Sequence, residues 1–526
     1  MTAERPGPAG QSFLRPTGRL CGRLALAGLL VLAGCRAPAP RPTAFTPREE
    51  VPLAGLPSGR AGWPAQAWWQ AFGDPQLDRL MDRAMAGSPT LAEAEARYRQ
   101  AQTMVEQARA QLNPQVRAML EGTHGYAHPH VPSPSVPAGA LPGAAGQAAN
   151  DELSGLGSRL LPSGWSNSFG GGALASWDLD AFGKLRASLA AAVGQARASE
   201  AERAAAATSL QYNLAASYYA WQANAAMLDI ARRDRDLAAA NLAIVEARVG
   251  AGVDDPTSLD DARSQLASAS QQLARLEGQA RLGEAQLAAL VGVSVAELGP
   301  LTARPLPPSS GALPADASLA LIARRPDLVA NRWRIEAAAR NVDAARAAFY
   351  PDIRLTALGA YLGTNPTDGG HAHLALFNFG PSISLPLLDG GRLTAQYEGR
   401  RAELEAAIAA YNASVVQAAQ DVAQQVLTLG QLDREREAQG RMVAAARDRL
   451  ARVEQRTRSG VADPRQSLRE HMQLDQQLAG ALDLEAQLLR TRLALIHALG
   501  GGYQADVPDV GAIARGAPTP SKDRTP

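Results

Sequence analysis

The most constraining feature of this sequence is an internal duplication. The segment Leu91–Pro114 reappears as Leu328–Pro351, with an Ala-Arg-Ala trio and a closing proline at the same places in both. Further along, Arg248–Pro256 reappears as Arg456–Pro464, where arginine, glycine, valine, aspartate and proline keep their spacing. Repeats of this length mark a duplicated structural unit. We therefore expect two similar halves related by pseudo-symmetry.

Each half is predicted to run helix, strand pair, very long helix, helix. Long runs without proline indicate the helices, and alternating apolar and aromatic residues between turn residues indicate the strands. The helices predicted in the first half are Pro75–Gly87, Pro89–Leu112, Lys184–Val249 and Thr257–Val291, and its strands are Gln115–Glu121 and Trp165–Leu179. In the second half the helices are Pro326–Phe349, Arg392–Arg458 and Arg465–Leu499, and the strands are Asp352–Leu362 and Leu374–Leu388.

The longest predicted helices decide the fold class, which is mixed α and β, mostly α. Lys184–Val249 would be about 100 Å long at 1.5 Å per residue. Such a helix cannot be buried in a globular domain, so it must pack in an extended bundle or coiled coil. A coiled-coil rod contains no β-strands, so the predicted strands argue against that fold. Four strands are too few for a transmembrane barrel, which needs about eight or more, so a barrel must be shared between subunits.

The N-terminus, residues 1–34, is predicted to be a signal peptide. Three arginines precede the apolar run Leu24–Ala33, which is too short to span a bilayer as a helix. The run ends in Leu-Ala-Gly before Cys35, which resembles the lipobox of bacterial lipoproteins. That resemblance implies a covalent lipid on Cys35 as the only added group. Because Arg36 follows rather than Asp, it also implies an outer membrane location. The alternative is an ordinary signal peptide with a chance cysteine.

Composition and the repeat set the other boundaries. Residues 35–75 are predicted to be a lipidated tether, because the stretch after the cysteine is rich in proline. Repeat 1 covers 76–298 and repeat 2 covers 315–503, with a linker rich in proline and glycine at 299–314. Residues 504–526 carry proline, serine and charge, and predict a disordered tail.

Composition and missing motifs exclude several function classes. The net charge of +1 gives no electrostatic attraction for nucleic acid, so no nucleic-acid partner is expected. The sequence has no Gly-x-Ser-x-Gly, His-Glu-x-x-His or P-loop pattern, which predicts that the protein is not an enzyme. A structural or adhesive periplasmic coiled-coil lipoprotein stays open as an alternative. A periplasmic hydrolase with helical insertions would need a nucleophile–base pair that the sequence does not offer.

Six short motifs carry a family resemblance. They are Trp68-Trp69-x2-Phe72-x-Asp74-Pro75-x-Leu77, Asp178-Leu179-x2-Phe182-Gly183, Arg325-Pro326-Asp327-Leu328, Ala344-Ala345-Arg346-x2-Phe349-Tyr350-Pro351, Pro386-x2-Asp389-Gly390-Gly391-Arg392 and Ala498-Leu499-Gly500-Gly501-Gly502. In this order, over residues 65–503 and with the lipobox, they resemble the outer membrane efflux protein family (TolC-like), in its lipoprotein branch of NodT type.

The resemblance implies an architecture and a function. Three chains would form a homotrimer, in which they share one 12-stranded outer membrane β-barrel continuous with a periplasmic α-helical barrel. The assembly would be the exit duct of a tripartite efflux pump that passively conducts drugs or other small toxic compounds to the outside. Its partners would be a periplasmic adaptor, an inner-membrane transporter and outer membrane lipid.

The resemblance also places the closed periplasmic end of the duct at the two repeated turns. Asp260 and Asp261 follow the first turn, and Arg465 and Arg469 follow the second. We expect Asp–Arg pairs between neighbouring hairpins to form a gate there, because such pairs are geometrically specific. The alternative is a solvated charged surface, where each pair is worth about 0–1 kcal/mol.

Histidines gather in or near the two predicted hairpin loops. A metal site would need more ligands in convergent geometry than the two His-x-His pairs supply. The sequence therefore predicts no metal site, with metal binding as the alternative. These histidines are His124, His128, His130, His371 and His373.

Overall fold

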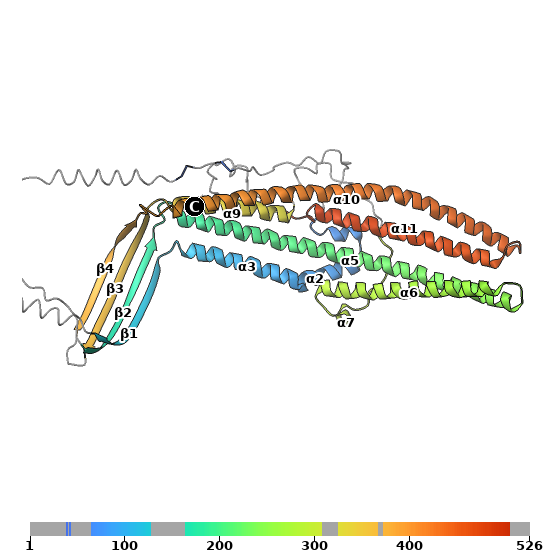
Figure 1. The fold of residues 1–526 in the computed structure, drawn as a ribbon, viewed down its shortest axis with the longest axis horizontal. Coiled ribbons are helices and arrows are strands. Elements are labelled where there is room, and N and C mark those ends of the chain that lie inside the picture. Colours follow the sequence, from blue (N-terminus) through green and yellow to red (C-terminus); the bar gives the residue numbers. More distant parts are fainter. Residues whose placement is uncertain are drawn as a thin grey trace, which may run out of the picture. The chain divides into compact units, whose positions relative to one another are not determined.

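The computed structural model describes residues 38–39, 42–43, 65–127, 164–307, 325–366 and 372–504. Cys35, His128, His130 and His371 lie outside the described residues. The element order follows the duplication, with a strand pair and a helical hairpin in each half (Figure 1). The chain is mostly helical, as predicted.

The bounds of the elements are as follows. The first half contains η1 (Trp68–Phe72), α2 (Pro75–Gly87), α3 (Pro89–Ala110), β1 (Gln115–Ala127), β2 (Gly164–Asp178), α5 (Lys184–Gly250), α6 (Pro256–Val291) and α7 (Val295–Leu298). The second half contains α9 (Pro326–Ala347), β3 (Asp352–Pro366), β4 (Ala372–Ser384), α10 (Arg392–Arg458) and α11 (Pro464–Ala498).

The four strands form one antiparallel sheet in the order β1-β2-β3-β4. The two halves meet where β2 pairs with β3, with Leu174 opposite Leu358. Several predicted strand limits need correction. β3 continues past Leu362 to Pro366 because these residues pair with β2, and β4 begins at Ala372 rather than Leu374. Residues 122–127 are strand rather than loop, because they pair with residues 164–169 of β2 despite their glycines. The last strand ends at Ser384 rather than Leu388, where the ladder with β3 ends at Asp352.

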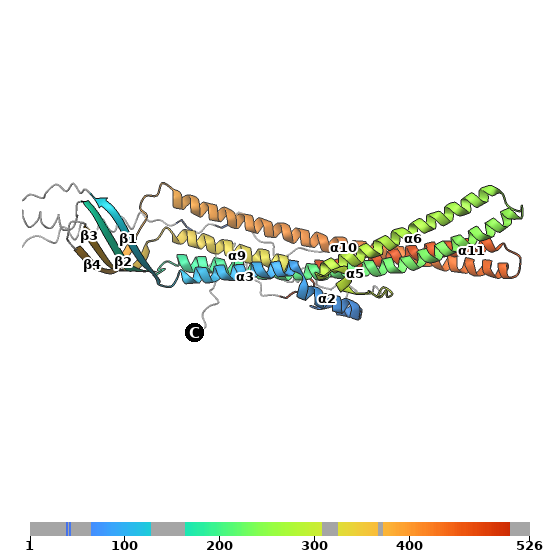
Figure 2. The same cartoon turned by 90° about the horizontal axis from the view of Figure 1, so that it is seen from below.

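The chain divides into two compact units, and each contains parts of both repeats. The sheet unit holds the strands and the adjoining helix ends, residues 106–190 and 340–401. The helical unit holds the described parts of 41–105, 191–339 and 402–526. In the helical unit, α5 with α6 and α10 with α11 form two long hairpins (Figures 1 and 2). Among the described residues, no helix is long and apolar enough to cross a membrane.

The core of the helical unit gathers around η1 and α2. Trp68 is only 5% exposed and packs with Tyr218 of α5, Leu287 of α6 and Leu493 of α11. The sequence prediction assigned residues 35–75 to the tether, whereas Trp68–Phe72 of this range form the helix η1. The reason is apolar burial, since Trp68, Trp69 and Phe72 all belong to or pack against this core.

Candidate functional site

The two helical turns have the same backbone, as their repeated sequences predict. Gly252 has a φ of 71° and Gly460 a φ of 73°, a left-handed conformation that glycine adopts without strain. In each turn the valine amide after the glycine donates to an arginine carbonyl at 2.9 Å. Both turns close the preceding helix in this way.

Aspartate begins the second helix of each hairpin. Asp255 Oδ1 accepts from the Thr257 amide at 2.7 Å, and Asp463 Oδ1 accepts from the Arg465 amide at 2.8 Å. Each aspartate is an N-cap and is followed by proline at the first helical position. These local roles explain why the Asp-Pro pair occurs in both copies.

The side chains of the two turns differ, and the difference joins the hairpins. Asp254 of the first turn stands where the second has Ala462. Arg248 donates to both Asp254 oxygens, at 2.9 and 3.0 Å. Arg465, at the start of α11, donates from Nη1 to Asp254 Oδ2 at 2.9 Å. Its Nε and Nη2 donate to Asp463 Oδ2. We call these four residues, Arg248, Asp254, Asp463 and Arg465, the tip network.

Hydrogen bonds and opposite charges favour the ionised form of the tip network, against the effect of partial burial. The Asp254 side chain is 14% exposed and that of Arg465 is 23% exposed. The hydrogen bonds from Arg248, with the charge of Arg465, hold the pKa of Asp254 below its usual range. Hydrogen bonds from Arg465 likewise lower the pKa of Asp463. The ion pairs are therefore lost only as the pH falls through these lowered pKa values, below the usual range of an aspartate.

A second ion pair joins the hairpins farther along α11. Arg233 Nη2 of α5 lies 3.2 Å from Asp475 Oδ1, and Asp475 is only 7% exposed. The adjacent Asp234 has an oxygen without a hydrogen-bond partner. Burial raises the pKa of Asp234 to about 6, and the nearby Asp475 carboxylate adds to the effect.

The residues predicted to form the gate have different surroundings in a single chain. Arg465 belongs to the tip network. Asp260 lies 3.7 Å from Arg263 of the same helix. Asp261 and Arg469 are exposed, and within the described chain no ion pair joins them to each other. Sequence reasoning missed Asp254, although the mismatch between this residue and Ala462 in the other copy was a usable signal.

The strand register gives the sheet two chemically different faces, because directly opposed residues share a face. One face, which we call the charged face, carries every Asp, Glu, Lys and Arg of the strands. These are Arg117, Glu121, Asp178, Asp352 and Arg354. Along each strand the alternate residues form the uncharged face.

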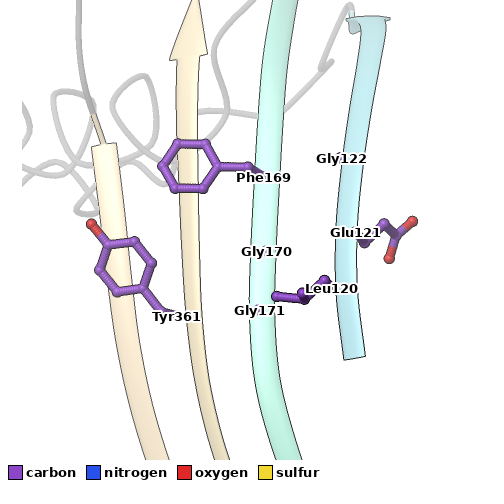
Figure 3. Close-up of a pocket in the computed structure, with 7 residues that line it drawn as sticks. All are labelled: Leu120, Glu121, Gly122, Phe169, Gly170, Gly171 and Tyr361. Carbon is purple, nitrogen blue, oxygen red and sulfur yellow. The ribbon is translucent and has the colours of Figure 1, made fainter. Parts of the chain in front are cut away.

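The uncharged face is mostly apolar and aromatic, with His124, Asn167, Asn365 and His373 near one end. Its side chains include Leu120, which is 90% exposed, and Phe377, which is 80% exposed. Leu120, Phe169 and Tyr361 border a hollow of about 510 Å³ (Figure 3). Glycines of β1 and β2 line the same hollow, and Leu120 leans across β2 toward one of them, Gly171 (Figure 3).

The described histidines of the sheet have ring partners rather than convergent ligands. His124 stacks on Trp165 at 5.0 Å, and its Nδ1 lies 2.6 Å from Asn167 Oδ1. His373 stacks on Tyr361 at 6.2 Å. Within the described residues, no group of three or more His, Cys, Asp or Glu has the arrangement of a metal site. The absence of a metal stays a prediction.

Comparisons with known proteins agree with the family resemblance. The sequence model described as outer membrane efflux protein matches residues 80–293 and 318–501. The multidrug resistance outer membrane protein MdtP of Escherichia coli (strain K12) is 33% identical over 466 residues, which cover 87% of this chain and 91% of MdtP.

Solved structures give the same fold. The outer membrane protein VceC of Vibrio cholerae matches with a TM-score of 0.69 at 28% identity, over 84% of this chain and 100% of VceC. The CmeC outer membrane channel of Campylobacter jejuni matches with a TM-score of 0.73, over 92% of this chain and 98% of CmeC. The identity to CmeC is 16%, so that likeness shows the fold alone.

Proposed function

Because this chain belongs to the outer membrane efflux protein family, we propose that it is the exit duct of a tripartite efflux pump. It would passively conduct drugs or other small toxic compounds from the periplasm to the outside. A periplasmic adaptor and an inner-membrane transporter would be its partners. The relative MdtP is named for multidrug resistance, which supports drugs as cargo.

The two faces of the sheet support a barrel made by three chains. A bilayer excludes charge, so the uncharged face would meet lipid and the charged face would line the duct. In the described chain, β1 and β4 each have one edge without a strand partner. Such edges invite pairing with another chain, and three sheets of four strands would give a 12-stranded barrel.

The tip network supports a gate at the periplasmic end. Arg465 bonds Asp254 of one hairpin while it bonds Asp463 of its own, so the two hairpins cannot separate without breaking charge-assisted bonds. We propose that this network holds the resting duct closed and that adaptor docking releases it. The single observation that carries the gate is the 2.9 Å contact between Arg465 and Asp254.

Conductance of the purified protein in planar bilayers tests both the proposed duct and the proposed gate. A duct gives single-channel currents and a heat-modifiable oligomer on gels, whereas a coiled-coil lipoprotein gives neither. Replacing Arg465 by Ala should raise the resting conductance and the sensitivity of cells to large antibiotics. Arg469→Ala is the matched control, since Arg469 is exposed on the same helix and makes no ion pair within the described chain.

Two outcomes would count against the gate while leaving the duct intact. The first is an Arg465→Ala protein that conducts no more than wild type. The second is an equal increase in Arg469→Ala, which would favour the predicted pairing of Asp261 with Arg469 between neighbouring hairpins. In that case the charge swap Asp261→Arg with Arg469→Asp should restore closure.

A further inference from the structure

The charged face of the sheet contains an apolar patch that its other residues do not explain. Residues that stand opposite one another on β1 to β4 form rows across the sheet. Three successive rows carry leucine or methionine side chains. Leu362 and Leu374 stand directly opposite each other and are 47% and 50% exposed. We call this patch the leucine belt, and its members are Met119, Leu174, Leu358, Leu362, Leu374 and Leu376.

Hydroxyl groups border the leucine belt along the strands. Beyond one side, Ser168 donates to Thr364 at 3.5 Å, which confirms that these two opposed side chains share the face. Beyond the other side, Ser176 stands opposite Thr356. The leucine belt is therefore a bounded apolar zone between polar zones, unlike the continuous apolar surface that a bilayer requires.

Two charges stand at the side of the leucine belt, on β1. Arg117 and Glu121 are exposed and flank Met119 at alternate positions of the strand. Within the described chain neither forms an ion pair. An apolar surface of limited extent beside a cation and an anion is complementary to small amphipathic ions, which pair an apolar body with one charge.

We propose that the leucine belt is a contact site inside the duct for amphipathic organic ions. This inference rests on the proposed duct and assigns a contact surface within it. The apolar part of the ion packs on the leucine belt and is thereby removed from water. Glu121 attracts the charged group of a cation, and Arg117 that of an anion. Because a pore site must release what it binds, the contact is brief and weak. Solutes without an apolar body pass the leucine belt without delay.

Single-channel recording with three probes tests the proposal on the full-length oligomer in planar bilayers. The probes are tetraphenylphosphonium, deoxycholate and glucose, added on the barrel side. In wild type both amphipathic ions should produce resolvable current blockades, and glucose none. Replacing Leu362 and Leu374 together by Thr should shorten the blockades about tenfold, with unchanged potassium chloride conductance. Threonine keeps the strand propensity.

Control variants separate the leucine belt from the other face and from charge. Leu120→Thr on the uncharged face should leave the blockades unchanged. Glu121→Gln should shorten only tetraphenylphosphonium blockades, and Arg117→Gln only those of deoxycholate. If the double variant does not assemble, Leu374→Thr alone should shorten the blockades about threefold.

The results that would overturn the leucine belt differ from those that would overturn the duct. Blockades of wild-type length in the leucine variants, or shorter blockades in Leu120→Thr instead, overturn the contact site while salt conductance still supports the duct. If neither the wild-type protein nor the Arg465→Ala variant forms a channel, the duct is overturned, and the leucine belt with it.

Discussion

Replacing Tyr218 by Phe should loosen the linker between the two repeats. The Tyr218 hydroxyl donates to Asp74 Oδ2 at 2.6 Å and accepts from Gln222 and Gln76 at 2.8 and 3.1 Å. These glutamines accept in turn from the linker, Gln76 from the Thr302 amide at 3.0 Å and Gln222 from the Arg304 amide at 2.6 Å. One hydroxyl thus orients the two glutamine side chains that accept hydrogen bonds from the linker.

The loss of local stability can be estimated from the hydrogen bonds that are removed with the Tyr218 hydroxyl. Burial, and then the Asp74 carboxylate, raises the pKa of Tyr218, so the hydroxyl stays protonated at neutral pH. Its loss removes a hydrogen bond to a charged group, worth about 1.5–3 kcal/mol. Both glutamines keep a bond to the Thr302 carbonyl, at 3.2 and 3.3 Å, so the linker should open locally rather than globally. A decrease of that size makes amide exchange roughly 10–100-fold faster.

Hydrogen exchange of the peptide that contains the Thr302 and Arg304 amides is the measurement. Tyr219→Phe is the matched control, because the Tyr219 hydroxyl is also buried but has no hydrogen-bond partner among the described residues. Its removal should leave the exchange unchanged or slower. Equal exchange in the two variants would refute the reasoning, since the hydroxyl would then contribute no more than an unpaired one.

Two further predictions concern the N-terminus and a buried acid. Mass spectrometry of the mature wild-type N-terminus should detect an acylated cysteine at residue 35, and Cys35→Ser should abolish it; an unmodified wild-type N-terminus at another residue would contradict lipidation. Asp234→Asn should raise the melting temperature more at pH 7.5 than at pH 4.5. The pKa of Asp234 is raised to about 6, so its ionisation costs stability as the pH rises from about 4 to 6, by roughly 1 kcal/mol after discounting partial exposure. Equal gains at both pH values would contradict this.

The helical hairpins could be predicted from the sequence because their signals are local. The turn glycines need a left-handed backbone, and the Asp-Pro pairs cap and begin the next helices. These requirements concern residues a few positions apart, so the same letters recur in both copies. Strand ends were harder to predict. Gly122 and Gly125 indicate a loop, but pairing with β2 keeps them in the strand, and that partner lies beyond a long intervening segment.

The tip network could not be predicted from either repeat alone. Arg465 and Asp254 are far apart in the chain, and no local rule relates them. Reasoning from position after the turn selected Asp261 and Arg469, which are equivalent in the two copies. Equivalent residues occupy the same position in their own hairpins. That equivalence does not bring their side chains into contact. The contact instead joins residues that are not equivalent in the repeat.

The duplication explains why the contact lies where the two copies differ. Where two hairpins have identical turns, equivalent residues carry the same charge, and like charges in contact repel. In this chain one copy supplies the acceptor of the contact and the other the donor. The first copy supplies Asp254 where the second has alanine, and the second supplies Arg465 where the first has Thr257. In a duplicated chain the shared residues therefore build the turns, and the diverged residues hold them together.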